Sequence, residues 1–130
     1  MRVNSPVTQR ELPFPEGAVL VSRTDAKGVI DYANGAFVRI SGFTEEELLG
    51  RAHNIVRHPD VPPAVFADMW RTLRKGRLWN GIVKNRAKSG DHYWVEANVT
   101  PVVQGEAIVG ASWGAEQPGR RAASRSRQPA

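Results

Sequence analysis

A cluster of titratable side chains surrounds a proline in the segment Asn54-Ile55-Val56-Arg57-His58-Pro59-Asp60. An arginine fork and an imidazole N–H can both bind phosphate or electron-rich ring oxygens. The nearby carboxylate can orient either cation or accept a hydrogen bond from a ribose hydroxyl. Arg57, His58 and Asp60 are therefore candidate contacts for an anionic ligand. The same spacing also fits a purely structural turn held by an Arg–Asp pair.

A second set of candidates alternates along two predicted strands. Alternation places Trp79, Gly81 and Asn85 on one face of residues 78–86, where Trp79 offers a stacking surface and Gly81 leaves room for it. The Asn85 amide can donate or accept at the edge of a planar ring. Tyr93 falls on the inward face of the next strand. Trp94 falls on its outward face, as a partner surface or as a surface tryptophan packed on its neighbours.

Five strands and three helices are predicted to carry these side chains. Apolar runs between turn residues predict strands at 18–22, 29–32, 78–86, 91–103 and 107–114. Helices are expected at 33–40, at 44–50 with the capping-box spacing of Thr44 and Glu47, and at 62–75. The fold class is α+β, with several short helices packed on one face of a five-stranded antiparallel sheet. Asn34 is expected to cap or brace the first helix.

Composition limits the function classes. The 130 residues contain no cysteine, which excludes disulfides, thiolate metal sites and cysteine nucleophiles. We expect an irregular leader at 1–17, one domain at 18–114 and a disordered basic tail at 115–130. Most of the net charge of +5 lies in that tail, so nucleic-acid binding is not expected of the folded part. The sequence shows neither a signal peptide nor a membrane span, which favours the cytoplasm.

Several motifs resemble the PAS fold. They are Tyr-Ala-Asn-Gly-Ala-Phe at 32–37, Ser-Gly-Phe-Thr at 41–44 and Lys-Ser-Gly-Asp at 88–91, within a match over residues 18–113. Longer blocks at 53–60, 66–70, 81–86 and 90–95 look like the N-terminal PAS domain of bacterial aerotaxis receptors. That domain binds FAD and reports redox, oxygen or energy state. We expect no counterpart in this sequence of the membrane anchor, relay module and signalling domain of those receptors.

The resemblance implies an FAD site and a signalling role. FAD would contact Arg57, His58, Asp60, Trp79, Asn85 and Tyr93, with His53 and Asn34 as further candidates. It also places Phe66 and Trp70 against the flavin, although both residues fit helix core equally well. The partners it implies are other signalling modules or a receptor, reached through the outer sheet face, and a second copy of the chain in a homodimer.

Alternatives to a flavin sensor remain open at this point. A PAS domain with haem, using His58 as an axial ligand, and a ligand-free interaction module both fit the sequence. A metal site is not expected, because His53, His58, Asp60 and His92 lack tight ligand spacing. Light-oxygen-voltage photochemistry is excluded by the missing cysteine in residues 53–58. An enzyme is not expected, since no nucleophile–base pair or carboxylate pair is visible.

Overall fold

The computed structural model describes residues 6–119. Its elements, in chain order, are β1 (Val19–Asp25), β2 (Ile30–Ala33), α1 (Gly35–Ser41), α2 (Glu45–Leu48), the 3₁₀ helix η1 (His53–Val56), α3 (Pro63–Arg74), β3 (Trp79–Arg86), β4 (His92–Gln104) and β5 (Ala107–Glu116). The expected order of two strands, helices and three strands is confirmed.

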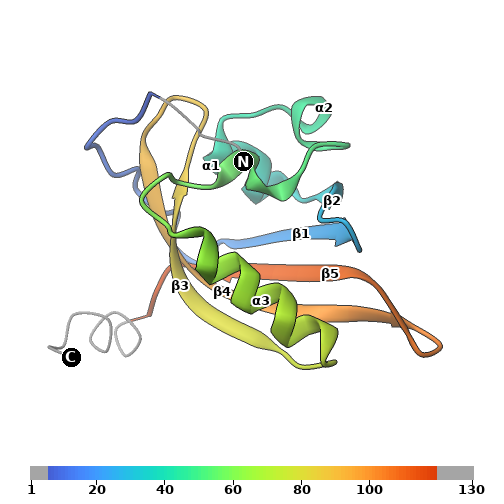
Figure 1. Cartoon of the computed structure of the whole chain (residues 1–130). Coiled ribbons are helices and arrows are strands. Elements are labelled where there is room, and N and C mark those ends of the chain that lie inside the picture. Colours follow the sequence, from blue (N-terminus) through green and yellow to red (C-terminus); the bar gives the residue numbers. More distant parts are fainter. Residues whose placement is uncertain (1–5, 120–130) are drawn as a thin grey trace, which may run out of the picture.

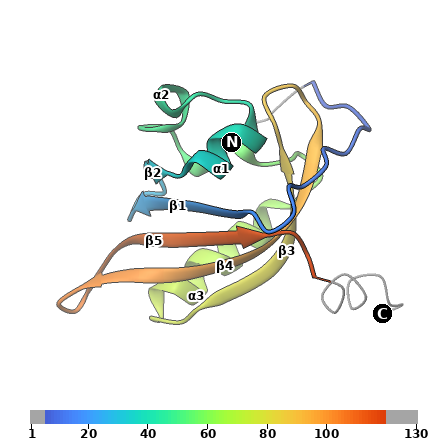
Figure 2. The same cartoon turned by 180° about the vertical axis from the view of Figure 1, so that it is seen from behind.

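The five strands form one antiparallel sheet in the order β2-β1-β5-β4-β3. The N-terminal hairpin therefore pairs with the last strand, and β3 lies at one edge. The helices lie on one face of this sheet (Figure 1), and the opposite face is seen in Figure 2. The predicted α+β class with a five-stranded sheet is confirmed.

Local capping explains where the short helices begin. The Asn34 side chain accepts a hydrogen bond from the Phe37 amide, and Gly42 ends α1 with a φ of 74°. Thr44 and Glu47 form the predicted capping box at the start of α2. These contacts satisfy amide groups that a short helix cannot pair internally, so the α1–α2 segment keeps a defined path over the sheet.

The predicted inward face of β4 is confirmed. Tyr93, Val95, Ala97 and Val99 are at most 4% exposed, whereas Trp94 on the other face is 41% exposed. By the same alternation His92 shares the outward face with Trp94, yet it is only 8% exposed. The chain at residues 8–12 lies against it: the His92 amide donates to Arg10 O, and the Leu12 amide donates to His92 O.

Both β1 and β5, which pair with each other inside the sheet, are longer than their apolar runs. β1 continues to Asp25 rather than ending at residue 22, and β5 continues to Glu116 rather than 114. Their pairing runs from Val19 opposite Glu116 to Asp25 opposite Gly110. Backbone pairing extends β1 through the polar residues Ser22 and Thr24, which are 4% and 3% exposed. The C-terminal ends of β1 and β5 were not predicted, because the expected strands were bounded by their apolar residues and not by their pairing.

The structure describes only part of the expected leader and tail, from residue 6 and up to residue 119. Residues 6–12 form no helix or named strand, yet Arg86 Nε donates to Pro6 O and the Thr8 amide donates to Gly90 O. Arg10 forms an ion pair with Asp91 at 3.2 Å. This segment therefore packs along the β3–β4 end of the sheet. The predicted disordered tail at 115–130 is wrong at its start, because residues 115 and 116 belong to β5, and residues 120–130 lie outside the described residues.

Candidate functional site

A cavity of about 280 Å³ lies between the helices and the inner face of the sheet. Its sheet wall consists of inward residues of β1, β3, β4 and β5, among them the aliphatic side chains of Leu20, Val83, Val95, Ala97 and Ala115. Its opposite wall comes from α1, η1 and α3. Small and aliphatic side chains on the sheet leave room there, because bulkier residues at these positions would fill the space.

Three rings stack along one wall of the cavity. The His53 ring lies 3.8 Å from the Trp113 ring, at an interplanar angle of 9°, and 5.9 Å from the Phe37 ring at 14°. His53 Nε2 is also 3.1 Å from the Ser22 hydroxyl. Residues from η1, β5, α1 and β1 thus meet at one planar, polar-edged surface. Such a surface suits a flat, conjugated ligand.

The imidazole of His53 is neutral at physiological pH. The ring is partly exposed and lines the cavity, and its burial among protein atoms lowers its pKa from 6.5 to about 4. A buried ring loses the hydration that stabilises its charged form. His53 therefore offers an uncharged ring and a hydrogen-bonding edge to the cavity rather than a positive charge.

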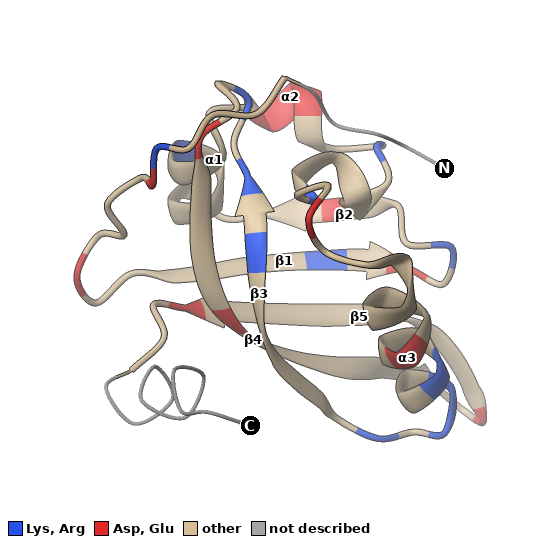
Figure 3. Cartoon of the chain, turned by 60° about the vertical axis from the view of Figure 1, so that its left-hand side comes forward, with Lys and Arg blue, Asp and Glu red and all other residues tan. Residues whose placement is uncertain are grey.

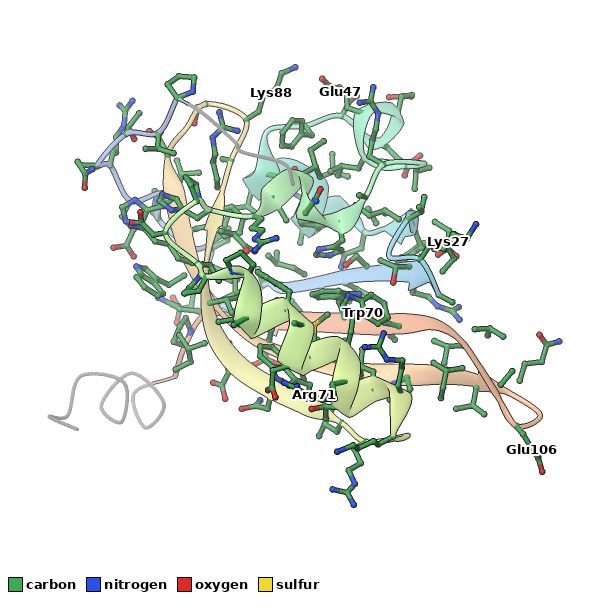
Figure 4. The ribbon with its side chains drawn as sticks, viewed as in Figure 1. Lys27, Glu47, Trp70, Arg71, Lys88 and Glu106 are labelled. Carbon is green, nitrogen blue, oxygen red and sulfur yellow. The ribbon has the colours of Figure 1, made fainter. Side chains whose placement is uncertain are left out.

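Two cationic side chains reach the cavity. The Arg57 guanidinium lies 4.9 Å from the centroid of the Phe66 ring, and both residues line the wall beside α3. Lys27 follows β1 in the turn to β2, next to Gly28, which packs close to the Trp70 ring. In Figure 4, Lys27 and Trp70 mark this side of the molecule.

The charge of the cavity wall has one sign. Among the described residues that line it there is no aspartate or glutamate, while Lys27 and Arg57 both contribute positive charge. Elsewhere, basic and acidic residues are interspersed over the described elements (Figure 3). The cavity therefore favours an electron-rich or anionic ligand over a cation.

Asn85 places an amide at the cavity wall beside a buried hydroxyl. The backbone of Arg57 forms an antiparallel bridge to Asn85, which closes the η1 end of the cavity against β3. Directly across the ladder, Asn85 pairs with Tyr93, which is 0% exposed. Burial raises the pKa of the Tyr93 hydroxyl, so this phenol is protonated at physiological pH.

The structure brings together half of the sequence-predicted site residues. Five of the ten line the cavity: His53, Arg57, Phe66, Trp70 and Asn85. Tyr93 lies behind Asn85 rather than in the wall. The remaining four, Asn34, His58, Asp60 and Trp79, point to other parts of the fold.

His58 and Asp60 turn away from the cavity. His58 is 2% exposed, and its Nδ1 accepts the Asp60 amide at 3.1 Å, which leaves the proton on Nε2. Burial, followed by the charge of Lys84, lowers the pKa of His58. The Asp60 carboxylate forms an ion pair with Lys84 at 3.0 Å. These contacts make the His-Pro-Asp turn a brace between η1 and β3.

Trp79 and Asn34 also have structural contacts outside the cavity. A Cβ on Gly81 would come within 2.7 Å of the Trp79 ring, so Gly81 does leave the expected room for it. The Trp79 indole N–H then donates to Asp68 of α3 at 3.3 Å. The Asn34 amide is fully used by backbone: it accepts from Val21 N and donates to Val19 O, in addition to capping α1.

Sequence reasoning missed four cavity residues that matter for its chemistry: Trp113, Phe37, Ser22 and Lys27. A signal for Trp113 was present, because alternation along β5 groups Ala111, Trp113 and Ala115 on the inward face. Phe37 lies within the motif at 32–37. Ser22 alternates with Leu20 in the predicted strand at 18–22, but its polar side chain gave no sign of facing the interior. Nothing in the local pattern points to Lys27, which lies in the turn after β1.

The described residues form neither a metal-binding cluster nor a membrane-spanning helix. Across residues 6–119, no three histidine, aspartate or glutamate side chains lie close enough to share a metal ion. In the same part of the chain, each helix is too short or too polar to cross a lipid bilayer.

A family model described as the PAS fold matches residues 30–110, so the chain belongs to the PAS fold family. Within it, the chain is 55% identical over 104 residues to the aerotaxis receptor of Escherichia coli (strain K12), covering 80% of this chain and 21% of the receptor. It is 36% identical over 93 residues to the nitrogen fixation regulatory protein of Klebsiella pneumoniae, covering 70% of this chain and 19% of that protein. The chain therefore spans about a fifth of the length of these relatives.

Solved structures show the same fold. The dark structure of the blue-light photoreceptor Aureochrome1 LOV has a TM-score of 0.71 at 20% identity, covering 82% of this chain and 80% of that one. The PAS domain of a protein from Colwellia psychrerythraea has a TM-score of 0.70 at 21% identity, covering 76% and 85%. The predicted PAS fold and the resemblance to aerotaxis receptors are confirmed, and the chain is a PAS sensor domain of the kind used in signal transduction.

Proposed function

We propose that this PAS domain binds FAD in the cavity between α3 and the sheet and reports the redox or oxygen state of its surroundings. The observation that carries the proposal is the cavity wall itself. It combines a planar stack of His53 and Trp113, an amide at Asn85 and the cations Arg57 and Lys27, with no carboxylate among its described residues. A flavin needs these groups: an apolar slot, polar contacts at the ring edge and positive charge for its phosphates.

The size of the cavity fits the ring system rather than the whole dinucleotide. About 280 Å³ is near the lower end of small-molecule pockets. The ring would therefore lie inside, and the phosphates would extend to the side where exposed Lys27 lies beside Gly28 and Trp70. When bound, the flavin would supply electron-transfer chemistry. The protein's part is to hold the ring, orient its edge through Asn85 and compensate the phosphate charge.

Haem gains no support from this geometry. His58, the candidate axial ligand, is held outside the cavity by its contact with the Asp60 amide. His53 does line the cavity, but its ring is packed face to face with Trp113. A flat ligand beside that stack would meet the imidazole by its plane rather than by a nitrogen lone pair.

The signal would leave through the outer sheet face. On this face Trp94 is 41% exposed, and its ring lies 5.9 Å from the Lys84 ammonium. A groove of about 390 Å³ extends from these two residues around the β3 edge of the sheet to the start of α3. It is lined by Asp60, Val61, Pro62, Val65, Ile82, Val83, Lys84 and Trp94. Such a mixed aromatic and charged surface suits a second signalling module or a second copy of the chain in a dimer. We place this exchange in the cytoplasm.

The test is the colour of the purified protein and the identity of any released chromophore. We expect a yellow protein with flavin absorbance, and FAD as the species released on denaturation. A colourless protein that takes up neither FAD nor FMN would leave an interaction domain without cofactor. A Soret band would assign haem instead.

A further inference from the structure

Tyr93 carries a buried polar group that neither the fold nor the cavity wall uses. The side chain is 0% exposed, and among the described residues its hydroxyl makes no hydrogen bond of good geometry. Buried hydroxyl groups without partners are uncommon, because each loses its hydrogen bonds to water on folding. Burying the Tyr93 hydroxyl therefore costs free energy that no hydrogen bond of good geometry offsets.

The nearest polar side chain is Asn85, and Asn85 is a cavity residue. The two residues stand directly opposite each other on β3 and β4. Asn85 is close enough to lower the pKa of Tyr93 somewhat, against the larger rise caused by burial. Because Asn85 also lines the cavity while Tyr93 does not, the amide lies between the hydroxyl and a bound ligand.

The Asn85 amide and the Tyr93 hydroxyl can each act as hydrogen-bond donor or acceptor. A primary amide presents a carbonyl oxygen at one end and an NH₂ group at the other, so turning it over exchanges acceptor for donor. A phenol hydroxyl can rotate to donate to the carbonyl or accept from the NH₂ group. Whichever end of Asn85 faces the ligand, Tyr93 can satisfy the other end.

We propose that Tyr93 is a positioning residue: its hydroxyl follows the Asn85 amide and lets it present either its NH₂ or its carbonyl group to the ligand. This inference rests on the proposed flavin site. The edge of a flavin changes its hydrogen-bonding character on reduction, because a ring nitrogen that accepts a hydrogen bond gains a proton. Tyr93 thus allows one side chain to serve both redox states of the ligand.

The test compares Tyr93→Phe with a matched control in the flavin-loaded protein. Phenylalanine keeps the buried ring and removes only the hydroxyl. The control is Tyr32→Phe on β2, where the other tyrosine of the chain is 47% exposed. The readouts are the midpoint potential of the bound flavin, the affinity for FAD and the melting temperature of the ligand-free protein.

We expect Tyr93→Phe to change the ratio of affinities for oxidised and reduced flavin by roughly fivefold, the usual size of one neutral hydrogen bond. For a two-electron couple this corresponds to about 20 mV. The melting temperature of the ligand-free protein should change little, because there the hydroxyl makes no hydrogen bond of good geometry. Tyr32→Phe should change neither quantity. In an Asn85→Ala background, Tyr93→Phe should have no further effect on the potential.

Three results would overturn the inference about Tyr93. If the wild-type protein still binds flavin, none of them affects the proposed function. They are an unchanged potential in Tyr93→Phe, the same shift with Asn85 absent, and a marked loss of ligand-free stability, which would mean that the hydroxyl has a structural partner. A wild-type protein that binds no flavin would instead refute the proposed function, and the inference with it.

Discussion

At the scale of single residues, burial decides the chemistry of the cavity more than residue type does. His53 and His58 lie close together in the sequence, and burial lowers the pKa of both. Yet His53 faces the cavity and stacks on Trp113, whereas His58 faces the protein interior near His92. Two side chains of one type in one motif thus have separate roles: a neutral ring at the ligand site and a buried brace.

The low pKa of His53 makes stability depend on pH. Its pKa is about 4 in the folded protein, against an ordinary value of 6.5, so the unfolded chain binds the proton more tightly. The free energy of unfolding should therefore fall as pH drops from about 6.5 to about 4, and change no further below that range. We expect a loss of roughly 2–3 kcal/mol between pH 7.5 and 4.5 from this group, measured by urea unfolding.

His53→Gln provides the comparison, because glutamine can still bond to Ser22 but does not titrate. Its stability should fall less than that of the wild type over the same pH range. Some slope will remain, since the lowered pKa of His58 acts in the same direction. Equal slopes for wild type and variant would show that His53 is not buried as described.

Lys27 is the residue-scale test of how the phosphates are held. In the described structure it forms no ion pair, and it lies exposed at the cavity rim. Lys27→Glu should weaken FAD binding by roughly tenfold, equivalent to about 1.4 kcal/mol, and the difference should shrink at high salt. The control is Lys75→Glu, an exposed lysine after α3 and away from the cavity wall. Titration calorimetry at two salt concentrations distinguishes them; equal affinities would remove Lys27 from the site.

At the scale of elements, β1 and β5 approach each other closely at Gly110. A Cβ on Gly110 would overlap the Thr24 carbonyl oxygen, so any larger residue must push the two strands apart. Gly110→Ala should lower the free energy of unfolding by about 3 kcal/mol, at the high end of the cost of overpacking. The matched control is Gly114→Ala on the same strand, where the nearest atom would be 3.9 Å away.

We expect the Gly114 variant to stay within about 0.5 kcal/mol of the wild type, as surface substitutions do. Chemical denaturation of the two variants side by side measures the difference. Similar stabilities for both would mean that β1 and β5 are not paired as closely at Gly110 as the register requires.

The elements and their inward faces could be predicted from periodicity, turn residues and capping motifs. Tyr93, Val95 and Ala97 are examples, because alternation alone assigns them to the interior. The contents of the cavity could not be predicted in the same way. Ser22 lies opposite Trp113 only because β1 pairs with β5 across the whole chain, and such long-range pairing leaves no local pattern. The His-Pro-Asp turn misled for a related reason: its chemistry suits a ligand, but Asp60 pairs with Lys84 instead.

At the scale of the whole molecule, the cavity and the outer face share the same two strands. β3 and β4 carry Asn85 and Ala97 inward and Lys84 and Trp94 outward. Any change at the ligand edge therefore reaches the outer face through one layer of backbone. The β4–β5 hairpin, whose tip bears Glu106 in Figure 4, extends this layer beyond the helices.

Hydrogen exchange should detect this connection. We expect oxidised and reduced flavin-bound protein to differ in amide exchange along 79–86 and 92–103, with little difference in β2 at the far edge of the sheet. The physical reason is that reorientation of Asn85 alters the hydrogen bonding of β3 to β4. Identical exchange in both redox states would refute transmission through these strands.

The central claim, that FAD binds in the cavity between α3 and the sheet, is tested most directly by blocking that cavity. Ala97 lines it and is 4% exposed, so Ala97→Leu would occupy existing space with little cost to the fold. Thr100→Leu on the outer face of β4 is the control. In a titration with FAD, we predict binding by the wild type and by the Thr100 variant, and none by a folded Ala97 variant. Undiminished binding by the folded Ala97→Leu protein would contradict the account.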